Sequence, residues 1–178
     1  MFYNKGWHNE VTYPWEKIKK VWMKYWDQRK TILMDKTNTN IMRVTEIKKV
    51  FKNIVFLVMV RNPYAQVEGI IRRNDATTEY AAEFALGCLR YQKINKETQK
   101  NIFFVSYEDL CDNTEQVIYR IQEFIPELGM IKSDLEFSAH NFKTKGKMKI
   151  QNLNDEKINK LSSKQIQIIN SYFKKEED

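Results

Sequence analysis

The chain has 178 residues, of which 42% are hydrophobic and 13% aromatic, and this is enough apolar material for one globular domain with a sizeable core. Lys and Arg number 30 against 23 Asp and Glu, and the resulting net charge of +7 favours anionic partners such as nucleotides, phosphorylated or sulfated molecules, nucleic acid or acidic membrane. No apolar run reaches the roughly 18 to 20 residues of a membrane span, and the start MFYNKGWHNE lacks the apolar core of a signal peptide.

Cysteine usage argues against a disulfide framework and against zinc. Cys88 and Cys111 are the only two cysteines, and neither lies in a CxxC motif or beside a histidine cluster. We therefore expect no metal site, a reducing compartment and, by default, a cytoplasmic location.

The first part of the chain predicts a helix, a strand and a second helix. Between Tyr13 and Lys30 apolar residues recur at three- and four-residue steps, which indicates an amphipathic helix. Thr31 to Met34 is a short apolar run that predicts a strand. A polar, turn-rich segment over residues 35–40 then leads into a helical pattern over residues 41–51.

Two further strand-and-helix units follow. Asn53 to Val60 is apolar at successive positions, which predicts a strand covered by helices on both faces, and the next helix begins at Pro63. A helical pattern over Thr77 to Lys100 precedes a strand at Ile102 to Ser106 and a helix through residues 117–125. This alternation predicts an α/β fold with a parallel sheet.

The last part of the chain predicts a loop and two closing helices. Residues 142–149 are rich in lysine and predict a loop. Asn154 and Ser162 are predicted to be helix N-caps, and Ser162 with Gln165 has the pattern of a capping box. Because there is no repeat and no low-complexity linker, residues 1–178 are predicted to form a single domain.

The end of the strand at 53–60 predicts an anion site. Asn62 is a good N-cap and Pro63 a good first helical residue, so backbone N–H groups at this helix start would point toward the strand end. Arg61 adds a permanent charge with a donor fork suited to phosphate, at the sheet edge where α/β proteins bind ligands. The alternative is a solvated or salt-bridged arginine, which the three residues RNP alone do not exclude.

Four segments in a fixed order resemble the sulfotransferases that use 3′-phosphoadenosine 5′-phosphosulfate. They are ILMDKTNTNIMRV, KNIVFLVMVRNPYAQVEGI, NIFFVSYEDLCDNTEQVIYRIQEFI and KTKGKMKIQNLN, and the resemblance spans residues 15–175. It implies a three-layer α/β sandwich with a parallel sheet, the P-loop NTPase-like sulfotransferase fold. It also implies transfer of a sulfuryl group from that co-substrate to a hydroxyl acceptor, without a metal.

The resemblance further implies a cofactor site. Arg61 matches the arginine that holds the cofactor's 3′-phosphate, whereas the serine that the family places eight residues later is Gly69 here. Tyr107 matches the tyrosine near the adenine in the family's Tyr-Glu-Asp-Leu motif, with an ordinary core or edge tyrosine as the alternative. Lys145 and Gly146 stand where many members have a basic loop that closes over the 3′-phosphate; a flexible surface loop is the alternative.

Asp35 and Lys36 resemble the start of the family's Glu-Lys-Ser-Pro turn. There the carboxylate acts as base toward the acceptor hydroxyl, and the lysine lies near the transferring sulfuryl group, where fixed positive charge lowers the barrier. Aspartate is one methylene shorter than glutamate. A solvent-facing lysine is the alternative for Lys36.

One part of the family pattern has no counterpart in the sequence. No stretch resembles the Gly-rich loop with Lys or Arg that follows the family's first strand and cradles the 5′-phosphosulfate, and there is no GxxxxGK[ST] motif. We therefore expect an N-terminally truncated domain with a compromised sheet, incomplete or inactive as an enzyme by itself.

The alternative is a non-catalytic basic module that binds nucleotides or a protein partner. Nucleic acid is the weaker option, because most aromatic residues occupy apolar-periodic positions rather than a basic face. The acceptor is left open and includes glycans, lipids, small alcohols and peptides.

Overall fold

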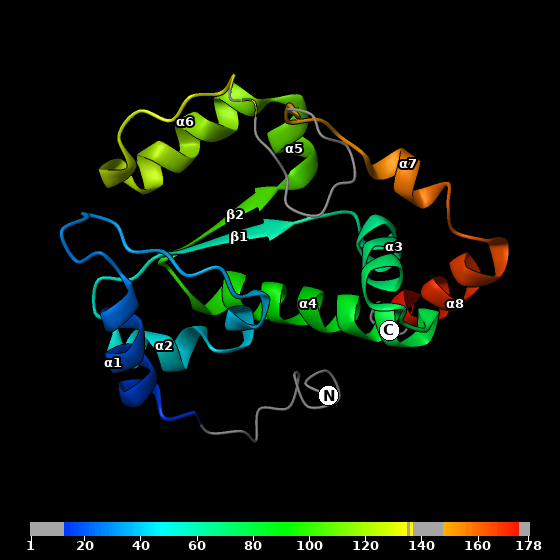
Figure 1. Ribbon diagram of the computed structural model, residues 1–178. Helices are drawn as coiled ribbons and strands as arrows, with labels where there is room; N and C mark the ends of the chain where they lie inside the picture. The colour runs from blue at the N-terminus through cyan, green and yellow to red at the C-terminus, as the bar shows by residue number, and fades with distance from the viewer. Residues whose placement is uncertain (1–12, 135, 137–147, 175–178) are drawn as a thin grey trace. The chain divides into compact units, whose positions relative to one another are not determined.

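The computed structural model describes residues 13–134, 136 and 148–174 (Figure 1). The chain divides into two compact units. Unit 1 comprises residues 1–58 and 87–103, and unit 2 comprises residues 59–86 and 104–178.

In unit 1 two helices pack through aromatic side chains. Helix α1 (Trp15–Tyr25) confirms the first predicted helix, and the short 3₁₀ helix η2 (Asn38–Met42) leads into α2 (Val44–Val50), which confirms the second. The ring of Trp22 stacks on that of Phe51 with centroids 5.9 Å apart. The apolar face of α1 therefore packs against the end of α2, as its periodicity indicated.

The strand predicted at Thr31 to Met34 is absent from the described residues, so that prediction is wrong. The backbone carbonyl of Met34 accepts a hydrogen bond from the indole nitrogen of Trp26 at 3.2 Å, and Ile32 and Leu33 are half-buried. A short apolar run has the same composition whether it pairs in a sheet or packs as irregular chain. Residues 32–34 take the second form and have no regular secondary structure.

The described residues contain a parallel sheet of two strands, β1 (Phe56–Val60) and β2 (Ile102–Ser106). Both strands were predicted, although β1 begins three residues later than expected. The prediction that both faces of β1 are covered is wrong, since Leu57 and Met59 are 47% and 50% exposed. Alternate residues of a strand face opposite sides, and only one side of β1 is covered.

The mixed architecture of helices around a parallel pair of strands confirms the α/β class at this coarse level. None of the helices within the described part of the chain is long and apolar enough to cross a membrane.

Unit 2 has a core formed by three helices. They are α3 (Pro63–Asn74), the start of α4 (Thr78–Thr98) and α8 (Ser163–Phe173). The buried members of this core are Val67, Ala81, Ala82, Ala85, Leu161 and Ile169. Three alanines on α4 leave room for the larger side chains of the other helices, which fits close packing of protein interiors.

The described part of unit 2 also contains other helices. They are α5 (Tyr107–Asp112), α6 (Thr114–Phe124), the 3₁₀ helix η3 (Pro126–Leu128) and α7 (Asn154–Ile158). The predicted helix through residues 117–125 is confirmed by α6, whose buried face carries Val117, Ile118 and Ile121.

The two N-caps predicted for the closing helices have different outcomes. Ser162 caps α8, and its capping box with Gln165 is formed, which confirms that prediction. Asn154 as an N-cap is wrong, because the capping position of α7 is Leu153 and Asn154 is the first helical residue. The side-chain amide of Asn154 bonds to Arg61 and Glu108 instead.

Truncation of Ile169 tests the core of unit 2. Ile169 is fully buried, so we expect Ile169→Ala to lower the free energy of unfolding by about 2–5 kcal/mol, through lost transfer energy and the cavity left behind. The neighbouring Ile168 is only partly buried, so Ile168→Ala is the matched control and should cost less. Urea denaturation followed by circular dichroism measures both, and equal losses would contradict this packing.

Candidate functional site

Arg61 lies between the end of β1 and the start of α3, and the cap of that helix is formed as predicted. The side-chain oxygen of Asn62 accepts hydrogen bonds from the backbone N–H groups of Tyr64 at 3.0 Å and Ala65 at 3.4 Å. Pro63 has no N–H group. The donors of this helix start are therefore engaged by the cap, not free to bind an anion as the sequence suggested.

The backbone N–H of Asn62 is also engaged. It donates to Oε1 of Glu108 at 2.7 Å. A carboxylate from α5 thus occupies the place near a helix N-terminus that attracts negative charge. Among the described residues of this corner, the side chain of Arg61 offers positive charge to a ligand.

The Arg61 guanidinium is held on two sides. Its central carbon lies 4.2 Å from the centroid of the Tyr107 ring, and its Nε donates to Oδ1 of Asn154 at 2.8 Å. The two terminal nitrogens make no hydrogen bond to any described residue. A guanidinium fixed in this way presents two parallel donors, the geometry that binds phosphate in a bidentate manner.

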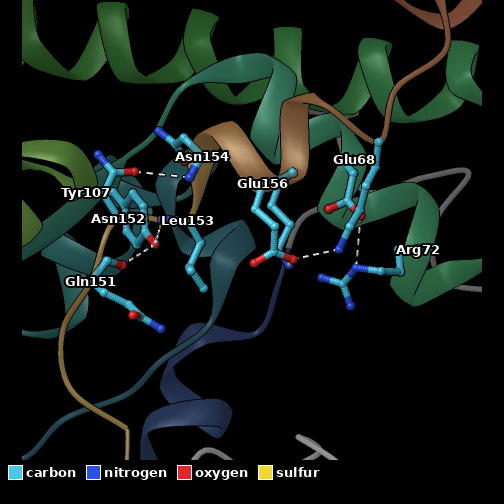
Figure 2. Close-up of polar contacts among 10 residues, drawn as sticks. Glu68, Arg72, Tyr107, Gln151, Asn152, Leu153, Asn154 and Glu156 are labelled. Atoms are coloured by element: carbon cyan, nitrogen blue, oxygen red, sulfur yellow. Dashed lines mark hydrogen bonds and ion pairs between the residues drawn. The ribbon is translucent and has the colours of Figure 1, made fainter.

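The hydroxyl of Tyr107 is fixed by the chain just before α7, as Figure 2 shows. It donates to the carbonyl of Gln151 at 2.9 Å and accepts from the N–H of Leu153 at 3.2 Å. Burial raises the pKa of the Tyr107 phenol above its usual range. The hydroxyl therefore keeps its proton at neutral pH, and the ring is a fixed platform under Arg61.

Glu108 accepts hydrogen bonds from three parts of the chain. Besides the N–H of Asn62, its donors are the Ser106 hydroxyl at 2.8 Å and the side-chain amide of Asn154 at 2.5 Å. Burial opposes the charged form, but the hydrogen bonds outweigh it and hold the pKa of Glu108 below its usual range. Glu108 is therefore a carboxylate at neutral pH.

Asn154 also lies beside Arg61, although the sequence indicated it as a helix cap. It is 6% exposed, and its amide lies between Arg61, to which it offers the oxygen, and Glu108, to which it offers the nitrogen. In a sequence, an asparagine before a helical pattern looks the same whether its side chain caps the helix or bonds to distant residues. No local signal therefore distinguishes these two roles.

The cofactor site predicted from the sequence also includes Gly69, Lys145 and Gly146. Gly69 is buried within α3, and a Cβ atom built there would have the terminal nitrogen of Arg73 as its nearest neighbour, at 3.9 Å. Lys145 and Gly146 lie outside the described residues.

Asp35 and Lys36 form an exposed segment of unit 1. One carboxylate oxygen of Asp35 accepts from the amide of Asn40 at 2.7 Å. Lys36 has no hydrogen bond or ion pair with a described residue. Of the predicted site residues, the structure thus brings Arg61 and Tyr107 together.

The described part of the chain contains candidate metal ligands and both cysteines. No group of three or more His, Cys, Asp or Glu side chains gathers there as a metal site. Neither Cys88 nor Cys111 is in a disulfide, and burial raises the pKa of the Cys111 thiol.

Comparison with known proteins gave one positive result. No curated protein and no solved structure matches the chain. A sequence model described as the sulfotransferase family matches residues 9–127, and these include β1, Arg61, β2 and Tyr107. The chain belongs to the sulfotransferase family.

Proposed function

We propose that this protein transfers a sulfuryl group from 3′-phosphoadenosine 5′-phosphosulfate to a hydroxyl acceptor, with Arg61 binding the 3′-phosphate. The observation that carries the proposal is the fixed guanidinium of Arg61, stacked on Tyr107 and bonded to Asn154, with both terminal nitrogens free among the described residues. The proposed fold is the three-layer, P-loop NTPase-like sandwich of the family.

The geometry of Arg61 suits a phosphate dianion. A guanidinium that is already immobilised loses little conformational entropy when it binds, so more of the charge-assisted hydrogen-bond energy appears as affinity. One face of the Tyr107 ring is occupied by Arg61. An adenine bound near Tyr107 would therefore contact the other face or the edge of the ring.

The chemistry proposed for the other end of the cofactor uses Asp35 and Lys36. The acceptor oxygen forms a bond to sulfur while the bond from sulfur to the nucleotide's phosphate oxygen breaks, and 3′-phosphoadenosine 5′-phosphate leaves. Asp35, whose second carboxylate oxygen has no hydrogen bond among the described residues, would take the hydroxyl proton. Lys36 would stabilise the charge on the leaving oxygen, and Lys145 and Gly146 would close over the 3′-phosphate.

The alternative is a nucleotide-binding module without transfer activity. The observation that favours it is the missing Gly-rich loop, since nothing in the sequence resembles the family's cradle for the 5′-phosphosulfate. Nucleotide binding that depends on Arg61, with no transfer by the full-length gene product, would select this alternative.

Removal of Arg61 tests the proposed phosphate site. We expect Arg61→Ala to weaken binding of 3′-phosphoadenosine 5′-phosphate by about tenfold or more, because hydrogen bonds to a charged group contribute about 1.5–3 kcal/mol. Isothermal titration calorimetry measures the affinity. The control is Lys164→Ala, which removes the same charge from an exposed position of unit 2; equal effects of the two substitutions would remove this site.

A serine at position 69 tests whether α3 faces the nucleotide. We expect Gly69→Ser to tighten binding of the same nucleotide, because its hydroxyl would add a hydrogen bond to the phosphate and a Cβ atom fits there without a clash. The matched control is Gly69→Ala, which adds the Cβ atom alone and gains the same kind of helix propensity. If serine binds no more tightly than alanine, the hydroxyl does not reach the ligand.

Asp35→Asn tests the proposed base. We expect it to lower transfer of labelled sulfate to a pool of hydroxyl acceptors by about 100-fold or more, with nucleotide affinity unchanged, because an amide accepts no proton at neutral pH. The assay uses the full-length gene product. Asp27→Asn, at an exposed carboxylate of the same unit, is the control. Normal transfer by Asp35→Asn would assign the base elsewhere.

A further inference from the structure

We propose that Asn154 is a positioning residue that keeps the charge of Arg61 available to a bound phosphate by separating Arg61 from Glu108. The inference rests on the proposed function, because it concerns how the same arginine is prepared for its ligand. Asn154 lies beyond residues 9–127, which match the family.

Two opposite charges flank the Asn154 amide without touching each other. Glu108 is ionised and Arg61 is permanently charged, yet no ion pair joins them among the described residues. The Asn154 amide lies between the two, accepting from Nε of Arg61 at 2.8 Å and donating to Oε1 of Glu108 at 2.5 Å. A direct ion pair would use the guanidinium nitrogens that a phosphate needs.

Only a neutral group with both a donor and an acceptor can make this bridge. The neighbours also fix the orientation of the amide, because Arg61 can only donate and the Glu108 carboxylate can only accept. An aspartate in this place would add negative charge beside Arg61. A shorter side chain would leave both charges free to meet.

The backbone around Asn154 reinforces the arrangement. The side-chain oxygen of Asn152 accepts from the N–H of Asn154 at 3.1 Å, and Gln151 and Leu153 hold the Tyr107 hydroxyl (Figure 2). One short segment therefore fixes both the ring under the guanidinium and the amide at its edge. This couples the position of Arg61 to the chain just before α7.

The test is a rescue experiment on the full chain with 3′-phosphoadenosine 5′-phosphate. We expect Asn154→Ala to weaken binding by roughly tenfold, because Arg61 would then pair with Glu108. Glu108→Gln keeps the shape of the side chain without its charge. We expect Asn154→Ala with Glu108→Gln to bind within about threefold of Glu108→Gln alone, so that the loss caused by Asn154→Ala disappears when position 108 is neutral. Urea denaturation of the same variants separates a structural role, in which the loss of affinity follows the loss of stability, from the proposed one, in which it follows the charge at position 108.

Two further variants complete the design. Asn159→Ala makes the same truncation at an exposed asparagine without a side-chain hydrogen bond among the described residues, and it should bind normally. Asn154→Asp preserves the shape and should also weaken binding by roughly tenfold or more, since its carboxylate pairs with Arg61. If circular dichroism shows that Asn154→Ala does not fold, Asn154→Asp provides the test of the separating role.

The outcomes separate this inference from the proposed function. If Arg61→Ala leaves the affinity unchanged, the proposed phosphate site itself fails. If Arg61→Ala weakens binding but the Asn154 variants do not, or if Glu108→Gln fails to rescue Asn154→Ala, the phosphate site stands and the separating role of Asn154 is overturned.

Discussion

The site in unit 2 depends on the hydrogen bonds to the carboxylate of Glu108. A partly buried carboxylate is costly unless donors surround it, and each donor that it recruits fixes another part of the chain. The donors come from the start of α3, the end of β2 and the start of α7, through Asn62, Ser106 and Asn154. Glu108 thereby joins three segments that are distant in sequence, and Arg61 lies among them.

The same carboxylate changes where an incoming anion can be bound. A helix start after a strand is ordinarily an anion site because its N–H groups are unpaired. Here the Asn62 side chain and the Glu108 carboxylate accept hydrogen bonds from those N–H groups. The carboxylate of Glu108 is therefore the anion at this helix start. Among the described residues of this corner, the proposed phosphate contact therefore depends on Arg61 and on whatever keeps that side chain from pairing with Glu108.

The sequence predicted the elements that have strong local signals. Strand β2, the Asn62 cap with Pro63, and the Ser162 capping box all follow from residue type and spacing over a few positions. The strand predicted at Thr31 to Met34 is wrong because a short apolar run does not specify whether it pairs in a sheet. In the structure the carbonyl of Met34 accepts a hydrogen bond from the indole of Trp26.

Within the site, the sequence could indicate Arg61 and Tyr107 but not how they are held. Their stacking follows from the parallel pairing of β1 and β2, which places the two strand ends at one edge of the sheet. The role of Asn154 depends on contacts with residues 93 and 46 positions away in sequence. Such contacts are set by tertiary packing, and the residues next to Asn154 in the sequence do not indicate them.

The two ends of the proposed cofactor place different demands on the protein. The phosphate end needs a cation held still before the ligand arrives, and the network of Tyr107, Asn154 and Glu108 would meet that demand through hydrogen-bonded groups that are partly or fully buried. The sulfuryl end needs a group that accepts a proton during transfer, and an exposed carboxylate such as Asp35 has the freedom to meet an acceptor hydroxyl. In the proposed reaction, rigidity around Arg61 would serve nucleotide binding, and exposure at Asp35 would serve proton transfer.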